Sequence, residues 1–147
     1  MLEQAETYLS KAIDLHPTYA TGLLNLGLVY YKLGKTDLAR QTWNRARTVY
    51  PNHPALEKFD AMLREHDLQD GIKLAQQGHV DEALPYFQRA VDSNPGDANA
   101  WFALGRAHGM KQDYRKAYEC WHKAAEIDPG NAQVQKGLAI LKRMGIP

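Results

Sequence analysis

Cysteine is almost absent from the sequence, since Cys120 is the single one among 147 residues. An internal disulfide and a zinc site with several cysteine ligands are therefore excluded. Long apolar runs are missing as well: none approaches the roughly 20 residues that a membrane-spanning helix needs, and residues 1–15 lack the apolar core of a signal peptide. We expect no membrane insertion and a cytoplasmic location, with an exported or periplasmic location as the alternative if the chain is a fragment.

An excess of charge of either sign is also missing. The 18 basic and 17 acidic side chains give a formal net charge of +1, so electrostatics give no reason to expect nucleic acid as a partner. The contents of 44% apolar and 24% charged residues are close to those of globular proteins. This composition argues against low-complexity disorder, and the length fits a single domain over residues 1–147.

Proline recurs at regular intervals after helix-like segments. Pro17, Pro51, Pro95 and Pro129 are separated by 34, 44 and 34 residues. An alanine stands twelve and five residues before each proline, and a large side chain stands eight residues before it. The three residues of each stripe are Ala5, Leu9 and Ala12; Ala39, Trp43 and Ala46; Ala83, Phe87 and Ala90; and Ala117, Trp121 and Ala124. Small, large and small residues along one helical stripe indicate that another helix packs closely there.

With these positions the sequence resembles the tetratricopeptide repeat (TPR) family, in which each repeat is a helix A, a tight turn and a helix B. Residues 20–53 resemble a full copy, with Gly27 in helix A, Gly34 at the turn and Pro51 after helix B. The resemblance implies an all-α fold, a right-handed superhelical solenoid of antiparallel helix pairs.

Two further copies complete the resemblance. Residues 98–131 resemble one of them, in which His108 takes a slot that is usually tyrosine and Gln112 takes the slot of the turn glycine. Residues 64–97 are a weaker copy, because Asp67 and Asp70 occupy helix A slots that are normally large and apolar.

Both ends of the sequence resemble half repeats. We expect residues 2–17 to form a helix B without a helix A before it, and residues 132–144 to form a C-terminal capping helix. A start half-way through a repeat suggests a truncated chain, or a chain that takes its missing face from a partner.

Ten extra residues between the first and second full copies interrupt the regular spacing. Leu56, Phe59 and Leu63 mark one helical face, whereas Leu68 and the apolar residues after it mark a face about 150° away, at about 100° per residue. One straight helix cannot turn both faces to one neighbour. We therefore expect residues 54–66 to form a separate inserted or capping helix. A single long helix with two packing partners is the alternative.

Residue types that carry catalysis or bind metals show no arrangement typical of either. No two of the six histidines are four residues apart, as a helical metal-binding pair would be. Cys120 lies beside a core position, so we expect a buried structural thiol, and no motif supplies the base that a nucleophile needs. His108 is expected to be a packing histidine. The sequence thus predicts a non-catalytic protein without cofactor or metal.

The resemblance implies that the helices A line a concave groove, which holds an extended peptide or a partner helix from another protein. The positions not used for packing predict these groove residues: Leu24, Asn25, Leu28, Tyr31, Leu68, Gln69, Ile72, Asn99, Phe102, Arg106 and Met110. The apolar members would receive apolar side chains and the amides would bind a peptide backbone. Arg106 would bind a carboxylate.

One ligand class of the family is disfavoured. Chaperone-adaptor members hold a C-terminal carboxylate with basic and asparagine residues on helix A. The matching slots in this sequence hold Leu24, Leu28, Gln69, Asn99 and Ala103. We therefore argue against a C-terminal carboxylate as the ligand.

A second hypothesis is a scaffold element that self-associates. Leu2, Leu9 and Ile13 on the unpartnered first helix would expose apolar area, so homo-oligomers through terminal helices would follow. A third class is RNA recognition by helix-pair repeats, as in the pentatricopeptide family. The 34-residue spacing, the alanine stripes and the balanced charge all argue against it.

Overall fold

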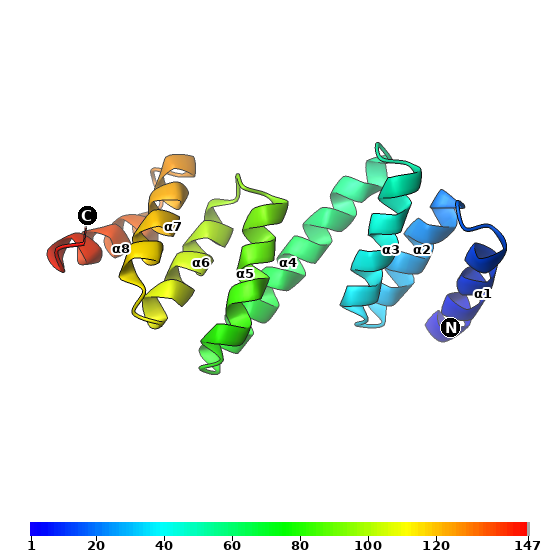
Figure 1. The fold of residues 1–147 in the computed structure, drawn as a ribbon, viewed down its shortest axis with the longest axis horizontal. Coiled ribbons are helices and arrows are strands. Elements are labelled where there is room, and N and C mark those ends of the chain that lie inside the picture. Colours follow the sequence, from blue (N-terminus) through cyan, green and yellow to red (C-terminus); the bar gives the residue numbers. More distant parts are fainter. Residues whose placement is uncertain (147) are drawn as a thin grey trace. The chain divides into compact units, whose positions relative to one another are not determined.

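Eight helices and no strand make up the regular structure of residues 1–146, which are the residues that this computed structural model describes (Figure 1). Pro147, the last residue of the expected domain, lies outside the described residues. The helices are α1 (Leu2–Leu15), α2 (Ala20–Lys32), α3 (Thr36–Val49), α4 (Pro54–Gln76), α5 (Val80–Ser93), α6 (Ala98–Met110), α7 (Tyr114–Ile127) and α8 (Ala132–Arg143). The predicted all-α fold is confirmed.

The chain divides into two compact units, one of Met1–Leu63 and one from Arg64 onward. In the first unit α2 packs against both α1 and α3. In the second unit α6 packs against both α5 and α7, and α7 also packs against α8. Each unit is thus a short stack, in which a helix contacts both the helix before it and the helix after it in the sequence.

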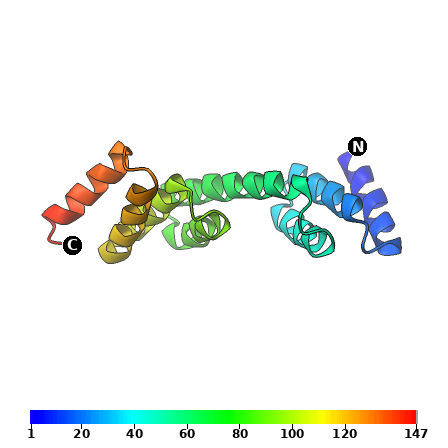
Figure 2. The same ribbon diagram turned by 90° about the horizontal axis from the view of Figure 1, so that it is seen from above.

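The inserted segment is one continuous helix, α4, which Figure 2 shows without interruption. The expected separate helix over residues 54–66 is therefore wrong, and the single long helix is the arrangement observed. Neither glycine nor proline stands between Ala55 and Asp70 to end the helix. The two apolar faces have different partners: Leu56, Phe59 and Leu63 belong to the core of the first unit, whereas Leu68 packs against the core of the second.

A large ring on one helix packs against a glycine on the preceding helix in each repeat. A Cβ atom added to Gly71 would lie 2.7 Å from the Phe87 ring, and one added to Gly105 would lie 2.5 Å from Trp121. Such distances are below any ordinary carbon–carbon contact, so only glycine allows the two helices to approach this closely.

The first unit has the same arrangement between α2 and α3. A Cβ atom on Gly27 would collide with Trp43, whose Nε1 donates a hydrogen bond of 3.0 Å to the Leu24 carbonyl oxygen. The Trp121 Nε1 donates an equivalent bond of 3.2 Å to the Phe102 carbonyl oxygen. The alanines of three of the four stripes are buried, whereas Ala5 and Ala12 of the first stripe are half-buried. The buried alanines are Ala39, Ala46, Ala83, Ala90, Ala117 and Ala124. The close packing predicted from the stripes is confirmed for these three.

One charged side chain lies within the core of the second unit. Asp67 is 2% exposed and accepts a hydrogen bond of 2.9 Å from Arg89 Nη2. The Arg89 guanidinium carbon also lies 4.5 Å from the centre of the Tyr86 ring. Arg89 thus neutralises the carboxylate that replaces a large apolar residue at this slot, and it joins α5 to α4.

The turns between the helices of a repeat require a left-handed backbone. Gly34 has φ of 74° and Gly78 has φ of 86°, but the third such turn places Gln112 at φ of 62°. A side chain at such a position costs roughly 1 kcal/mol or more relative to glycine. The turn at Gln112 is therefore a strained version of the other two.

We predict that Gln112→Gly raises the free energy of unfolding by about 1 kcal/mol, because it relieves this strain. Urea denaturation followed by circular dichroism measures the change. The matched control is Gln77→Gly, at a position that lacks a positive φ, where the added backbone entropy of glycine should lower stability by about 0.5–1 kcal/mol. The same sign of effect at both sites would contradict the explanation.

We also predict that Asp67→Ala lowers the free energy of unfolding by about 2 kcal/mol. The change removes a buried carboxylate and leaves a gap in the core, although the half-exposed Arg89 can be hydrated and so limits the loss. Asp70→Ala is the control: its carboxylate is 43% exposed and lies 3.3 Å from the His66 ring, so we expect a loss below about 0.5 kcal/mol. Equal losses in urea denaturation would show that burial of Asp67 is unimportant.

Candidate functional site

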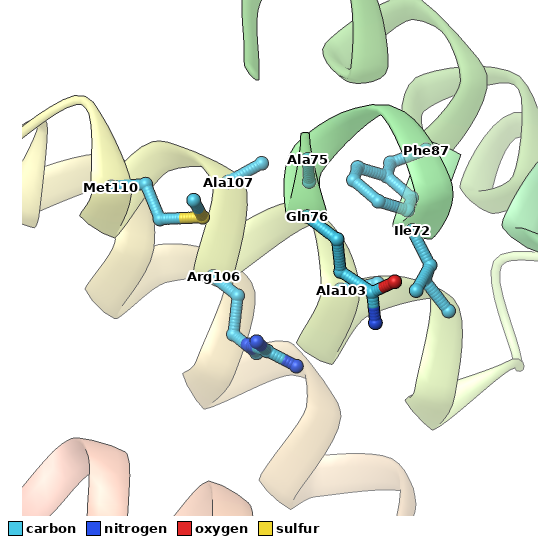
Figure 3. A pocket seen from close by; sticks show the side chains of 8 residues that line it. All are labelled: Ile72, Ala75, Gln76, Phe87, Ala103, Arg106, Ala107 and Met110. Carbon is cyan, nitrogen blue, oxygen red and sulfur yellow. The ribbon is translucent and has the colours of Figure 1, made fainter. Parts of the chain in front are cut away.

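An apolar hollow lies on the second unit where α4, α5 and α6 meet (Figure 3). Its volume is about 80 Å³, roughly half that of an engineered cavity that holds benzene. This size suits one aliphatic side chain and is too small for a cofactor. The residues that line it are Ile72, Ala75, Gln76, Phe87, Ala103, Arg106, Ala107 and Met110.

Three of the predicted groove residues meet at this hollow. Ile72 on α4 is 42% exposed and Met110 at the end of α6 is 52% exposed, so both present apolar surface to solvent. Arg106 is exposed on α6. Figure 3 shows Met110 and Arg106 on one side of the hollow and Ile72 and Phe87 on the other. The hollow is thus apolar with a cation at its edge.

The other predicted residues of the second unit surround the hollow without lining it. Leu68 packs against the core, and the Gln69 amide donates a hydrogen bond of 2.7 Å to Glu65. Asn99 is exposed near the start of α6. Phe102 stacks on Trp121 with ring centres 6.1 Å apart, so it is partly committed to packing.

The predicted residues of the first unit are less available. Leu24 is 4% exposed, and its assignment to the groove is corrected: α2 has neighbours on both sides, and this position faces the core. Leu28 and Tyr31 are half-buried against the same core. The Tyr31 hydroxyl donates a hydrogen bond of 3.4 Å to the Met62 carbonyl oxygen. Asn25 alone of the four is exposed.

The residues predicted for the groove did not include Phe87 or the small residues that create the hollow. Ala103 and Ala107 are one turn apart on α6, and Ala75 lies on α4. An alanine leaves space where a larger side chain would meet the neighbouring helix. The (i, i+4) alanine pair was visible in the sequence, but only the packing of α6 against α5 and α4 shows that the space remains unfilled.

Burial shifts the pKa values of two titratable side chains in the second unit, Cys120 and His108. Cys120 is 7% exposed, and burial, with a smaller contribution from Glu119, raises the pKa of its thiol to about 11. Burial also lowers the pKa of His108, against a smaller opposite effect of Asp113, and the lowered pKa favours the neutral imidazole. The expectation that Cys120 is a buried thiol is confirmed.

Neither a metal-binding cluster nor a membrane-spanning helix occurs in the described part of the chain. Within residues 1–146, histidine, cysteine and carboxylate side chains form no group of three that could hold an ion. Over the same residues, every helix is too short or too polar to cross a bilayer.

The fold places the chain in a class of proteins that are built from stacked helix hairpins, in which large rings of one helix pack against small residues of another. Tetratricopeptide repeat family models match residues 21–53 and 74–141, and a further TPR repeat model matches residues 2–34. The chain belongs to the tetratricopeptide repeat family. The fold of this family supports protein–protein interaction.

Known proteins of greater length contain similar segments. The human protein O-mannosyl-transferase TMTC3 is 26% identical over 144 residues, which are 95% of this chain and 16% of that protein. More generally, the chain spans only 13–23% of the length of the curated relatives that it matches.

Two solved structures show the same fold. MamA (residues 41 to the end) from Desulfovibrio magneticus RS-1 has a TM-score of 0.52 at 22% identity, covering 98% of this chain and 76% of MamA. The first TPR of Spaghetti (RPAP3), bound to an HSP90 peptide, has a TM-score of 0.51 at 20% identity, covering 85% of this chain and 91% of that one. At such identities the likeness concerns the fold alone.

We predict that Cys120 reacts with a disulfide reagent at pH 8 about 100-fold more slowly in the folded chain than in guanidinium. The pKa rises from 9.0 to about 11, and two pKa units lower the thiolate fraction about 100-fold. The rate of absorbance change after mixing measures the reaction. A cysteine placed at the exposed Ala139 of a Cys120→Ala chain is the control and should react at nearly its unfolded rate. Equally fast reaction of Cys120 would contradict its burial.

Proposed function

We propose that this chain is a non-catalytic protein-interaction module that binds a segment of another polypeptide over the exposed sides of α4 and α6. The observation that carries the proposal is the hollow between these helices. It is apolar, open to solvent and of the size of one side chain, which is the form of a pocket for an anchoring residue.

The energetics fit a binding site of modest affinity. Ile72 and Met110 are 42% and 52% exposed, so a ligand would cover roughly half of each side chain. On a scale of about 1.5–3 kcal/mol for a fully buried side chain, each contributes about 1 kcal/mol, and the inserted side chain contributes more. After the cost of association, an affinity on the order of micromolar is expected.

The similarity to the peptide-bound RPAP3 domain supports the choice of a polypeptide as ligand. That domain has the same fold with a TM-score of 0.51, and its structure contains a bound HSP90 peptide. Because the identity is only 20%, we carry over from that domain only the kind of ligand, a polypeptide. We expect the sequence of the ligand to depend on the residues that line the site.

Self-association stays a second, less supported candidate. The sequence predicts that Leu2, Leu9 and Ile13 expose apolar area on α1, but Ile13 is 4% exposed and Leu9 packs against the core. Tyr8 and Leu15 instead are 71% and 77% exposed. A cytoplasmic location likewise stays a prediction.

We predict that Ala103→Leu weakens peptide binding at least tenfold, because the added side chain fills the hollow that would receive the ligand. A phage library of random 12-residue peptides is first selected against the chain. The enriched peptides are then synthesised, and their affinities for the wild type and the variant are measured by fluorescence polarisation. Unchanged helical content and melting temperature ensure that the variant folds.

The control for this substitution is Ala125→Leu, on α7 of the same unit and outside the hollow. It adds the same side chain and should leave the affinity unchanged. The proposal is overturned if selection enriches no peptide, or if enriched peptides bind the Ala103→Leu variant as tightly as the wild type.

A further inference from the structure

Carboxylates are unevenly distributed among the helices of the second unit. Neither α6 (Ala98–Met110) nor α8 (Ala132–Arg143) contains an aspartate or glutamate. Their charged residues at neutral pH are all basic: Arg106, Lys136, Lys142 and Arg143. Because the whole chain has a net charge of only +1, this is a local asymmetry that the overall composition conceals.

The basic residues of α7 differ from those of α6 and α8 in their pairing. Arg115 lies 3.6 Å from Glu119, and Lys123 lies 3.4 Å from Glu126. In contrast, Arg106 and Lys136 form no ion pair within residues 1–146, and Arg106 lies 6.0 Å from the Phe102 ring centre. The cations of α6 and α8 are therefore available to a ligand.

The part of α4 in this unit does contain carboxylates, but each of them already has a partner. Glu65 accepts a hydrogen bond of 2.7 Å from Gln69, Asp67 accepts one of 2.9 Å from Arg89, and Asp70 lies 3.3 Å from His66. Among these partners only Arg89 is a permanent cation, so it is the charge of the buried Asp67 that is compensated within the unit.

The cation of α6 lies at the hollow, and α8 lies on the other side of the Trp121 ring from α6. Arg106 lines the hollow. Gly105, which precedes Arg106 on α6, and Gly137 on α8 both contact the Trp121 ring. A Cβ atom added to Gly105 would lie 2.5 Å from this ring, and one added to Gly137 would lie 2.8 Å from it. Lys136 precedes Gly137 on α8. It therefore lies on a helix that is separated from α6, the helix of Arg106, by the indole ring of Trp121.

We propose that the polypeptide segment bound by this unit is acidic, with an aliphatic side chain in the hollow and aspartate or glutamate side chains near Arg106 and Lys136. This inference rests on the proposed function and specifies the chemistry of its partner. The cations lie on separate helices, so they match carboxylates spaced along a chain. A single terminal carboxylate would instead need several donors at one point.

Three synthetic 12-residue peptides test the inference against the full chain. Each carries a central leucine, is amidated at its C-terminus and has two variable positions after the leucine, occupied by glutamate, glutamine or lysine. Because exposed charge pairs are weak individually and screened by salt, we expect the glutamate peptide to bind about tenfold more tightly than the glutamine peptide at low ionic strength. This difference should largely vanish in 0.5 M salt.

Matched variants connect the effect to the two cations. Arg106→Gln and Lys136→Gln should each weaken binding of the glutamate peptide about threefold, and each should weaken binding of the glutamine peptide less than that. Arg115→Gln, an identical substitution at an exposed and paired arginine of α7, should change neither affinity. Fluorescence polarisation measures all of these affinities.

The outcomes separate this inference from the proposed function. If the glutamate and glutamine peptides bind equally well and both are weakened by Ala103→Leu, the acidic preference is overturned and peptide binding stands. If a free C-terminal carboxylate on the glutamine peptide restores tight binding, the assignment to acidic side chains is overturned. If no peptide binds, and none is enriched by selection, the proposed function itself fails.

Discussion

The contact between a glycine of one helix and a large ring of the next is the interaction on which the fold depends. Gly27 meets Trp43, Gly71 meets Phe87, and Gly105 meets Trp121. The absence of a Cβ atom allows the two helices to approach, and the ring then fills the groove between them. Trp121 extends the stack, because its opposite edge meets Gly137 on α8. Because Trp121 contacts both α6 and α8, it joins the hairpin of α6 and α7 to α8.

The long helix α4 shows how this packing scheme accommodates an irregular spacing. Ten additional residues could have formed a loop, but they continue a helix in which no residue interrupts the hydrogen bonds. The N-terminal part of α4 is fixed by Phe59, which stacks on Trp43 at 4.3 Å between ring centres, and by the Arg47–Asp60 ion pair at 2.6 Å. The C-terminal part is fixed by Phe87 against Gly71 and by the pair of Arg89 with Asp67. Each part therefore belongs to the core that it contacts.

The candidate site arises from the same use of small residues. Glycine brings two helices together where a ring fills the space, whereas Ala75, Ala103 and Ala107 leave a space that no ring enters. The hollow is thus a place where the packing scheme is incomplete, and its size suits a side chain from a partner. Arg106 gives this apolar site a charged edge. A surface of this kind gains affinity from the anchoring side chain, while the surrounding charges determine which partners are attracted and which are repelled.

The sequence by itself determined the class of fold and the burial of the alanines in three of the four stripes, because these depend on residue spacing along individual helices. It also placed Ile72, Arg106 and Met110 on the exposed side. Tertiary structure alone decided that α4 is continuous, since the sequence does not specify whether two apolar faces are covered by one neighbour or by two. It also decided that Leu24 is buried and that Phe87 borders a hollow. Both outcomes depend on the side chains that neighbouring helices place opposite a given position, and helical periodicity contains no information about them.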